Sequence, residues 1–213
     1  MSRIVSGLYA VTPELIDTAE LLARVEAALR GGARMVQYRN KSADRFLQIR
    51  QAGAVARACR RTGACFIVND SITLAAEIDA DGVHLGSGDV DIDSARKALG
   101  PNKLIGISCY NQLSRAREAA GNGADYIAFG SFFASATKPV AMRADVELLA
   151  DARRTLVVPI VAIGGITPDN AQALIEAGAD ALAVVSALFD SADVEQTARR
   201  FASLFNIPVH PKA

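Results

Sequence analysis

The alternation that decides the fold is clearest in residues 160–186, which read IVAIGGITPDNAQALIEAGADALAVVS. This stretch begins with the apolar run Ile160–Ile163, continues through a glycine-containing turn into the Ala/Leu-rich segment Asp169–Ala177, and ends in the apolar run Ala181–Val185. Runs that are apolar at nearly every position are typical of strands buried on both faces, as in a parallel sheet. Residues 160–186 therefore predict a strand–helix–strand unit.

The same unit recurs along the whole chain, with about 27 residues in each repeat. The expected strands are Gly7–Val11, Met35–Tyr38, Cys65–Val68, Gly82–Leu85, Leu104–Ile107, Tyr126–Phe129, Ile160–Ile163 and Ala181–Val185. The segments that we expect to form helices are Leu15–Leu29, Ala43–Arg60, Ile72–Ile78, Asp93–Leu99, Leu113–Gly121, Val146–Arg154, Asp169–Ala177 and Val194–Phe205. Strict alternation implies a parallel sheet with right-handed crossovers. Eight such units predict a closed (β/α)8 barrel, since the open, doubly wound alternative more often has five or six strands.

No low-complexity linker or run of like charge divides the chain. We therefore expect one α/β domain, a single (β/α)8 TIM barrel over residues 1–206, followed by a loose tail over residues 207–213. Three similar strings combine the glycine that ends a helix with the entry to the next strand, and we interpret them as structural. They are Gly31-Gly32-Ala33-Arg34, Gly123-Ala124-Asp125 and Gly178-Ala179-Asp180.

The composition is that of a folded protein without a global attraction for nucleic acid. The chain has 213 residues, 51% of them hydrophobic, and its 23 basic and 23 acidic side chains balance. Disordered chains are poor in hydrophobic residues, and a zero net charge gives no overall pull toward nucleic acid or acidic membranes. Any anion must be bound by a local cluster of positive groups, so the expected partners are small molecules. The oligomeric state, including a homo-oligomer, stays open.

The expected location is the cytoplasm. The three cysteines, Cys59, Cys65 and Cys109, have neither metal-finger nor CxxC spacing, which suits a reducing compartment. The first residues lack the apolar region of a signal peptide, and no run approaches the roughly 20 apolar residues needed to span a bilayer.

In barrels of this kind the functional side chains lie in the loops after the carboxyl ends of the strands. The loop after the second strand contains Gln37, Arg39 and Lys41. Alternate side chains of an extended segment point the same way, so these three should bring an amide and two cations to the barrel mouth. A solvated basic loop is the alternative, but three such side chains at alternating positions favour a site.

Carboxylates follow the next two strands. Asp70 comes directly after Asn69, and Asp89 follows the fourth strand. Neighbouring carboxylates repel unless a cation intervenes, and Mg²⁺ takes one or two of them while leaving positions for water and phosphate. The pair therefore predicts a magnesium site, with helix capping as the alternative for either aspartate alone. His84, inside the fourth strand, is expected to be a hydrogen-bonded core histidine.

Hydroxyl groups follow the fifth and sixth strands. Ser108 ends the fifth strand and has no histidine beside it in the sequence, so hydrogen bonding is expected of it and nucleophilic attack is not. The connection over residues 130–139 is longer than most loops of its kind and contains Ser135, Thr137 and Lys138, which makes it a candidate lid.

The last two strands predict a phosphate site. Gly164 and Gly165 follow the seventh strand, and Ser186 follows the eighth. In barrels, backbone N–H groups and a helix N-terminus at these positions commonly bind a phosphate. With the cations near strands 2–4 and 6, this indicates two anion-binding regions, one suited to a diphosphate and one to a single phosphate. Two phosphorylated substrates and a departing diphosphate would explain both.

With these residues assembled, the sequence closely resembles the thiamine-phosphate synthase family. The matching strings fall in order across nearly the whole chain; each is common alone, and together they are specific. They are Gly7-Leu8-Tyr9-Ala10-Val11-Thr12, Val36-Gln37-Tyr38-Arg39-Asn40-Lys41, Asn69-Asp70, Asp81-Gly82-Val83-His84-Leu85-Gly86 with Asp89, Gly106-Ile107-Ser108, Thr137-Lys138, Val161-Ala162-Ile163-Gly164-Gly165-Ile166 and Val184-Val185-Ser186. The chain departs from the family pattern at Ser135, Ser87 and Tyr110, where the family usually has Thr, has Gln and frequently has His, respectively.

The resemblance implies a transferase of thiamine biosynthesis that joins an amino-substituted hydroxymethylpyrimidine diphosphate to a thiazole phosphate. It implies a dissociative reaction with Mg²⁺ as cofactor, in which diphosphate leaves, a pyrimidine methyl cation forms, and the thiazole nitrogen captures it. The residues implied for the pyrimidine diphosphate are Gln37, Tyr38, Arg39, Asn40, Lys41, Asn69, Ser108 and Lys138, of which Arg39, Lys41, Ser108 and Lys138 are the catalytic set. Those implied for the thiazole phosphate are Ser135, Ala136, Thr137, Gly164, Gly165, Val185 and Ser186, and those for Mg²⁺ are Asp70 and Asp89.

Three other functions compete with this one. A thiazole tautomerase-like relative would share the barrel but needs no diphosphate site. Five retained residues argue against it, namely Arg39, Lys41, Asp70, Asp89 and Lys138. A Schiff-base aldolase would use a lysine within a strand, whereas Lys41 and Lys138 follow strands. A non-catalytic thiamine-phosphate binding protein would bind the product tightly without turnover.

Overall fold

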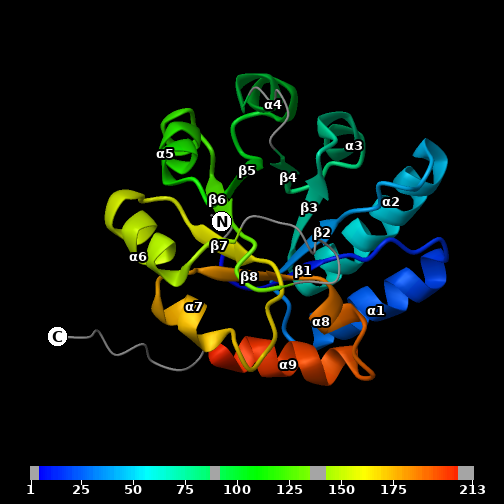
Figure 1. The fold of residues 1–213 in the computed structure, drawn as a ribbon. Helices are drawn as coiled ribbons and strands as arrows, with labels where there is room; N and C mark the ends of the chain where they lie inside the picture. Colours follow the sequence, from blue (N-terminus) through cyan, green and yellow to red (C-terminus); the bar gives the residue numbers. More distant parts are fainter. Residues whose placement is uncertain (1–4, 87–91, 135–142, 206–213) are drawn as a thin grey trace.

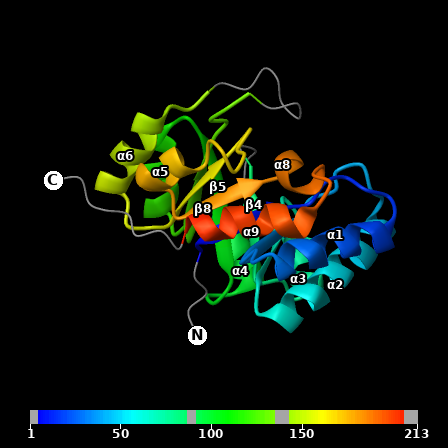
Figure 2. The same cartoon turned by 90° about the horizontal axis from the view of Figure 1, so that it is seen from below.

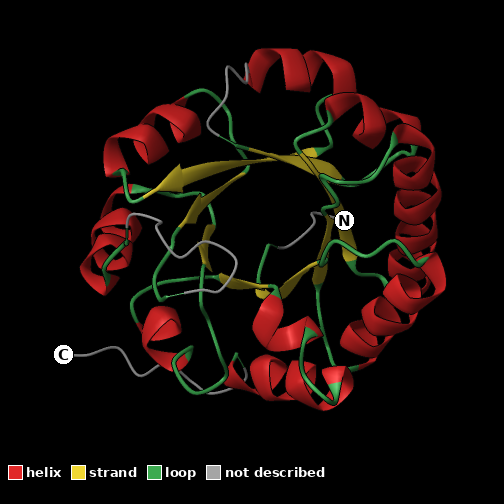
Figure 3. Cartoon of the chain, turned by 45° about the vertical axis from the view of Figure 1, so that its right-hand side comes forward, coloured by secondary structure: helices red, strands yellow, loops and turns green. Residues whose placement is uncertain are grey.

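The structure, a computed structural model, is a closed barrel of parallel strands enclosed by a ring of helices (Figures 1 and 3). It describes residues 5–86, 92–134 and 143–205. The strands β1 to β8 pair in sequence order, and β1 also pairs with β8, which closes the ring. The predicted single (β/α)8 barrel is therefore confirmed, while the predicted tail over residues 207–213 lies outside the described residues.

The elements agree closely with the predicted ranges. The strands are β1 (Gly7–Val11), β2 (Met35–Tyr38), β3 (Cys65–Asn69), β4 (Gly82–Leu85), β5 (Leu104–Tyr110), β6 (Tyr126–Phe129), β7 (Ile160–Ile163) and β8 (Ala181–Val184). The helices in the described ranges are α1 (Thr18–Arg30), α2 (Arg45–Thr62), α3 (Ile72–Glu77), α4 (Ile92–Leu99), α5 (Leu113–Gly121), α6 (Val146–Thr155), α7 (Gln172–Glu176), α8 (Ser186–Phe189) and α9 (Val194–Leu204).

Three of the differences from the predicted elements have identifiable reasons. Strand β5 continues past the predicted end at Ile107, because Ser108 and Tyr110 still pair with β6 across a register shift. Helix α7 begins at Gln172 and not at Asp169, since residues 167–170 first form a turn. The short helix α8 is not predicted from the sequence, because its 4 residues are too few to show a helical period.

The side chains of each strand alternate between two apolar clusters. In β1, Leu8 and Ala10 belong to the cluster that includes the helices, whereas Tyr9 and Val11 belong to the cluster that fills the barrel interior. Helix α1 packs beside both α2 and α9 on the outside (Figures 1 and 2). The interior cluster contains a second fully buried tyrosine, Tyr126. The barrel interior is therefore not purely apolar, and its hydroxyl groups lie directly beneath the mouth.

Three aspartates connect neighbouring strands at the end of the barrel where the strands begin, which we call the foot. The carboxylates of Asp81, Asp125 and Asp180 accept hydrogen bonds from backbone N–H groups of the preceding strand, at 2.8, 2.7 and 2.7 Å. Two of them also pair with arginines, Asp125 with Arg96 and Asp180 with Arg153. The glycine-containing strings that end in Asp125 and Asp180 thus lie at the end of the barrel opposite the mouth. Within the described ranges no helix is both long enough and apolar enough to cross a membrane.

Candidate active site

A cavity of about 790 Å³ opens at the mouth of the barrel. Residues from all eight strands or the loops after them line it, which is what a closed ring of parallel strands requires of a site at their carboxyl ends. The predicted site residues among them are Gln37, Arg39, Asn69, Ser108, Gly164, Gly165, Val185 and Ser186. A second cavity of about 490 Å³ adjoins it at Asn69, and its lining includes Lys41 and Asp70.

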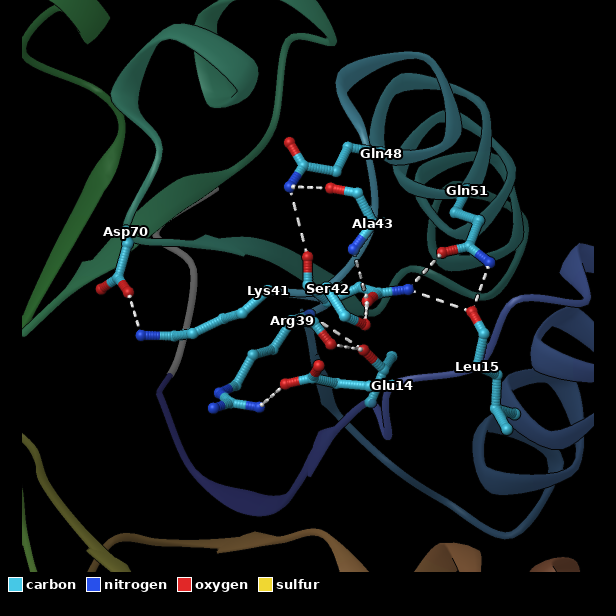
Figure 4. Close-up of polar contacts among 11 residues, drawn as sticks. Glu14, Leu15, Arg39, Lys41, Ser42, Ala43, Gln48, Gln51 and Asp70 are labelled. Carbon is cyan, nitrogen blue, oxygen red and sulfur yellow. Dashed lines mark hydrogen bonds and ion pairs between the residues drawn. The ribbon is translucent and has the colours of Figure 1, made fainter.

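The loop after β2 carries its two cations in ion pairs (Figure 4). The Arg39 guanidinium lies 2.7 Å from Glu14, and the Lys41 ammonium lies 2.9 Å from Asp70. The Thr12 hydroxyl holds the Arg39 backbone from β1, accepting from its N–H at 2.9 Å and donating to its carbonyl at 3.1 Å. Desolvation acts to raise the pKa of Glu14, but hydrogen bonds from Ser42 and Arg39 and the charge of Arg39 lower the pKa overall. The loop is thus preformed with both cations near the mouth.

The side chains of Tyr38 and Asn40 are directed differently from those of Gln37 and Arg39. The Tyr38 hydroxyl donates to Gln51 of α2 at 2.9 Å, and the tyrosine is buried. The Asn40 amide donates to the carbonyl of Leu15 at 3.0 Å and to Gln51 at 3.1 Å (Figure 4). Both side chains therefore hold the loop against α2, and both residues also line the second cavity, so their predicted contact with the pyrimidine diphosphate stays a prediction.

Asp70 has the backbone strain and the exposure of a ligand-binding residue. Its φ is 58°, in the left-handed region that residues other than glycine seldom adopt, and its N–H donates to the carbonyl of His84 at 2.8 Å. The predicted alternative, that Asp70 caps α3, is wrong, because the Ser71 hydroxyl accepts from the N–H of Leu74. The Asp70 carboxylate is therefore left to face the mouth.

The donor chemistry at Asp70 fits a hard divalent cation. Among the described residues no group of three or more metal-binding side chains occurs, and Asp89 lies outside those residues. Mg²⁺ needs only one or two carboxylates when phosphate oxygens and water complete its coordination. Asp70 is thus a suitable protein ligand for a magnesium–diphosphate complex.

A chain of five hydrogen-bonded side chains crosses the barrel interior at the floor of the cavity. The Gln37 amide nitrogen donates to the Tyr9 hydroxyl at 2.8 Å, and the hydroxyls of Tyr9 and Tyr126 lie 2.9 Å apart. The Tyr126 hydroxyl lies 3.1 Å from Nδ1 of His84, whose Nε2 lies 2.9 Å from the Ser108 hydroxyl. We call these five residues the interior chain; its members come from β2, β1, β6, β4 and β5.

The expectation that Ser108 has no histidine beside it is wrong. His84 and Gly106 are partners in the β4–β5 register, so Ser108, two residues further along β5, points to the same side as His84. His84 is nevertheless the buried, hydrogen-bonded core histidine that its position in β4 predicts, and burial lowers its pKa to about 4. Burial also raises the pKa values of Tyr9 and Tyr126, so all three groups are neutral at pH 7.

The opposite wall of the cavity is neutral and close-packed. Gly164 and Gly165 have φ values of 105° and 66°, which favour glycine. A Cβ atom on Gly165 would lie 2.5 Å from the carbonyl oxygen of Ala134, so this turn has no room for a side chain. Val185 and Ser186, at the start of α8, complete this wall. Apart from Arg39, none of the described lining residues of the cavity carries a charge.

Several predicted site residues fall outside the described ranges. They are Asp89, from the loop after β4, and Ser135, Ala136, Thr137 and Lys138, from the candidate lid after β6. Conversely, Tyr9, Glu14, His84 and Tyr126 are at or beneath the site but are not in the predicted set. Their positions give a sequence signal. Tyr9, His84 and Tyr126 lie within predicted strands, and Glu14 lies in the loop after the first strand.

Comparison with known proteins gives one consistent result. The family model described as thiamine monophosphate synthase matches residues 8–188. The chain is 56% identical over 202 residues to a thiamine-phosphate synthase from Methylobacillus flagellatus, which covers 95% of this chain and 96% of that protein. It is 52% identical over 200 residues to a thiamine-phosphate synthase from Aromatoleum aromaticum, covering 94% and 96%. A solved structure of thiamine phosphate pyrophosphorylase from Pyrococcus furiosus superimposes with a TM-score of 0.85 at 34% identity, covering 94% of this chain and 95% of that one.

Proposed function

Because this chain belongs to the thiamine monophosphate synthase family and is a transferase that forms thiamine phosphate, we propose that its mouth cavity and the adjoining cavity together bind both substrates of that reaction. The pyrimidine diphosphate binds on the side of β2 to β5, and the thiazole phosphate binds against the turn after β7 and the start of α8. Diphosphate leaves the pyrimidine, and the thiazole nitrogen bonds to the carbon from which it departed.

The observation that carries this proposal is the contrast in charge between the two walls. Arg39 and Lys41 lie on one side, whereas glycines and the start of a helix line the other. A diphosphate carries more negative charge than a phosphate monoester, so it is better matched to the wall that carries cations. The ion pairs with Glu14 and Asp70 are partly exposed, and such pairs contribute only about 0–1 kcal/mol, so substrate can exchange for them at small cost.

Asp70, with Asp89, is proposed to bind Mg²⁺ together with the diphosphate. When bound there, the ion neutralises charge on the departing diphosphate. Lys41 lies against Asp70 and Arg39 lies beside β1, so each can turn toward the leaving group without a change of backbone. Lys138 and the hydroxyls of Ser135 and Thr137 are proposed to close the site and keep water from the reactive cation.

The contact between Ser108 and His84 raises a second possibility, acyl transfer by a serine nucleophile, and the structure of that pair disfavours it. A catalytic base for serine needs a pKa near the working pH and an orienting partner such as a carboxylate. Burial lowers the pKa of His84 to about 4, and its Nδ1 faces the hydroxyl of Tyr126. Ser108 is therefore proposed to hydrogen-bond the pyrimidine and not to attack it.

The purified chain incubated with the pyrimidine diphosphate, the thiazole phosphate and Mg²⁺ tests this function. We expect thiamine phosphate and diphosphate in equal amounts, no thiamine phosphate when either substrate is omitted, and loss of activity when EDTA removes the metal. Diphosphate release without thiamine phosphate would contradict the synthase assignment, and full activity in EDTA would contradict the magnesium site. Tight product binding without turnover would favour a binding protein. The three cysteines, all buried and all within the described residues, form no disulfide, which supports the proposed cytoplasmic location.

A further inference from the structure

The interior chain joins the two substrate-facing polar groups of the pyrimidine side by way of three buried side chains. Gln37 and Ser108 line the mouth cavity, whereas Tyr126 is fully buried and Tyr9 is 1% exposed. Tyr9 and His84 also line that cavity, so Tyr126 is the one member of the interior chain that takes no part in its wall. A change at Tyr126 therefore reaches the cavity only through its neighbours in the chain.

The packing around Tyr126 holds the middle of the interior chain in one arrangement. Its ring stacks on His84 with ring centres 5.5 Å apart, and it meets the ring of Tyr9 edge-on at 6.2 Å. Room for the Tyr126 ring exists because residue 106 is a glycine: a Cβ atom there would lie 1.9 Å from Cζ of the ring. A glycine inside a strand commonly marks such a close approach.

One set of directions gives every hydrogen along this chain an acceptor within it. The Gln37 amide nitrogen only donates, so Tyr9 accepts from it and directs its own hydrogen to Tyr126. Tyr126 then donates to Nδ1 of His84. A neutral histidine that accepts at Nδ1 carries its hydrogen at Nε2, so His84 donates to the oxygen of Ser108. The hydroxyl hydrogen of Ser108 and the amide oxygen of Gln37 are left for the cavity.

We propose that Tyr9, Tyr126 and His84 are positioning residues whose hydrogen bonds hold Gln37 as an acceptor and Ser108 as a donor toward the pyrimidine. An amino-substituted pyrimidine offers the complementary pair, a ring nitrogen that accepts and an amino group that donates. This inference rests on the proposed function, because that function brings the pyrimidine to Gln37 and Ser108. If the donor and acceptor of one bond were exchanged, those of the other bonds would have to be exchanged too. The donor and acceptor roles of Gln37 and Ser108 are therefore coupled, although the two residues lie on different strands.

If these three side chains served only to stabilise the fold, their substitution would have a different effect. Buried hydroxyls need partners wherever they lie, and removing one lowers stability whether or not it affects recognition. A positioning role predicts that one particular preference is lost, namely that for the amino-bearing pyrimidine over an analogue with hydrogen in place of the amino group. It also predicts that binding of the thiazole phosphate is spared.

The test compares Tyr9→Phe and Tyr126→Phe with the unchanged chain. Each variant keeps the ring and removes two bonds of the interior chain. Tyr9→Phe removes those to Gln37 and Tyr126, and Tyr126→Phe removes those to Tyr9 and His84. The measurements are equilibrium binding of the two pyrimidine diphosphates by calorimetry, and KM for both substrates in turnover. We expect the unchanged chain to prefer the amino-bearing compound about tenfold or more, and each variant to lose most of that preference. KM for the thiazole phosphate should stay within about twofold, since the four bonds of the interior chain join side chains of β1, β2, β4, β5 and β6, on the pyrimidine side.

Thr62→Val is the matched control, because it also removes a hydroxyl that hydrogen-bonds within the fold, to the Cys59 carbonyl at 3.1 Å, at the end of α2 away from the mouth. It should keep the full preference. An unchanged preference in both tyrosine variants, or equal losses for both substrates, would overturn the positioning role. Binding is measured separately from turnover, so the two hypotheses can fail separately. If the unchanged chain made no thiamine phosphate, the proposed function would be refuted. If the variants still lost the preference for the amino-bearing pyrimidine, the positioning role would be supported.

Discussion

At the foot of the barrel Asp180 pairs with Arg153, and at the mouth Asp70 pairs with Lys41, yet the two aspartates are held differently. Asp180 also accepts from the buried N–H of Ile160 at 2.7 Å, and Arg153 is bound to the carbonyl of Gly178 at 2.9 Å. Asp70 and Lys41 are 45% and 57% exposed, and Asp70 lies in the left-handed backbone region. Asp180 and Arg153 are also partly exposed, at 33% and 40%, so the main difference is that the pair at the foot is bound to the backbone as well.

This difference indicates that the foot of the barrel contributes to stability and the mouth contributes to activity. A carboxylate that satisfies a buried N–H cannot be removed without leaving that N–H unpaired, so it belongs to the fold. An exposed ion pair contributes little to folding, and its charges are available to a charged ligand. Substitutions at the foot should therefore change stability with little effect on catalysis, and substitutions at the mouth should do the reverse.

The largest effect that would test this separation is expected from Lys41→Ala. Loss of a cation facing the departing diphosphate should lower kcat about a hundredfold, the usual cost of removing one charge-stabilising group from an active site. The melting temperature should change by only about 1–2 °C, because the Lys41–Asp70 pair is exposed. Lys97→Ala, at an exposed position of α4, is the control. If Lys41→Ala kept kcat and lost stability, the contrast between the two ends would be wrong.

A smaller effect, on stability alone, is expected from Asp180→Ala. The N–H of fully buried Ile160 would lose its partner, which should lower the free energy of unfolding by about 1–3 kcal/mol. Chemical denaturation measures this, and KM for both substrates should stay the same. The matched control is Asp169→Ala, which removes a carboxylate paired with Arg200 on the surface and should cost less than about 1 kcal/mol. Equal losses for the two substitutions would show that the backbone contact adds nothing.

The third effect, no larger than that of Asp180→Ala, concerns His84, between the two ends, and appears only when the pH is lowered. Burial lowers the pKa of His84 from 6.5 to about 4 in the folded chain, while the neighbouring Asp70 charge acts in the opposite direction. Between these two values the unfolded chain binds one more proton than the folded chain, so stability decreases as the pH falls through this window. His84 should make the protein about 2 kcal/mol less stable at pH 5 than at pH 7.

Unfolding by urea at pH 7 and at pH 5, for the unchanged chain and for His84→Asn, isolates this contribution from those of the carboxylates. The variant should lose less stability between the two pH values than the unchanged chain does. An identical pH dependence in both would mean that His84 is protonated in the folded state, and the direction assigned to the interior chain would then be wrong.

Much of the candidate site follows from the sequence once the barrel is predicted. Gln37, Arg39 and Ser108 were expected at the mouth from their places at strand ends, and all three line the cavity. Gly164 and Gly165 line the other wall as expected. Their roles in binding stay predictions. Strand ends are local features, and in a closed parallel barrel each of them must lie at the same mouth.

The family, the eightfold alternation and the strand ends can all be predicted from the sequence, because burial on both faces and helical amphipathicity leave periodic patterns in neighbouring residues. Which polar side chains meet inside the ring depends on the three-dimensional fold. Tyr9 and Tyr126 are 117 residues apart in sequence, and His84 reaches Ser108 only through the register of β4 against β5. Glu14 likewise meets Arg39 only when β1 and β2 are paired. Such contacts depend on strand register and on the closure of the barrel, which no local pattern of residues encodes.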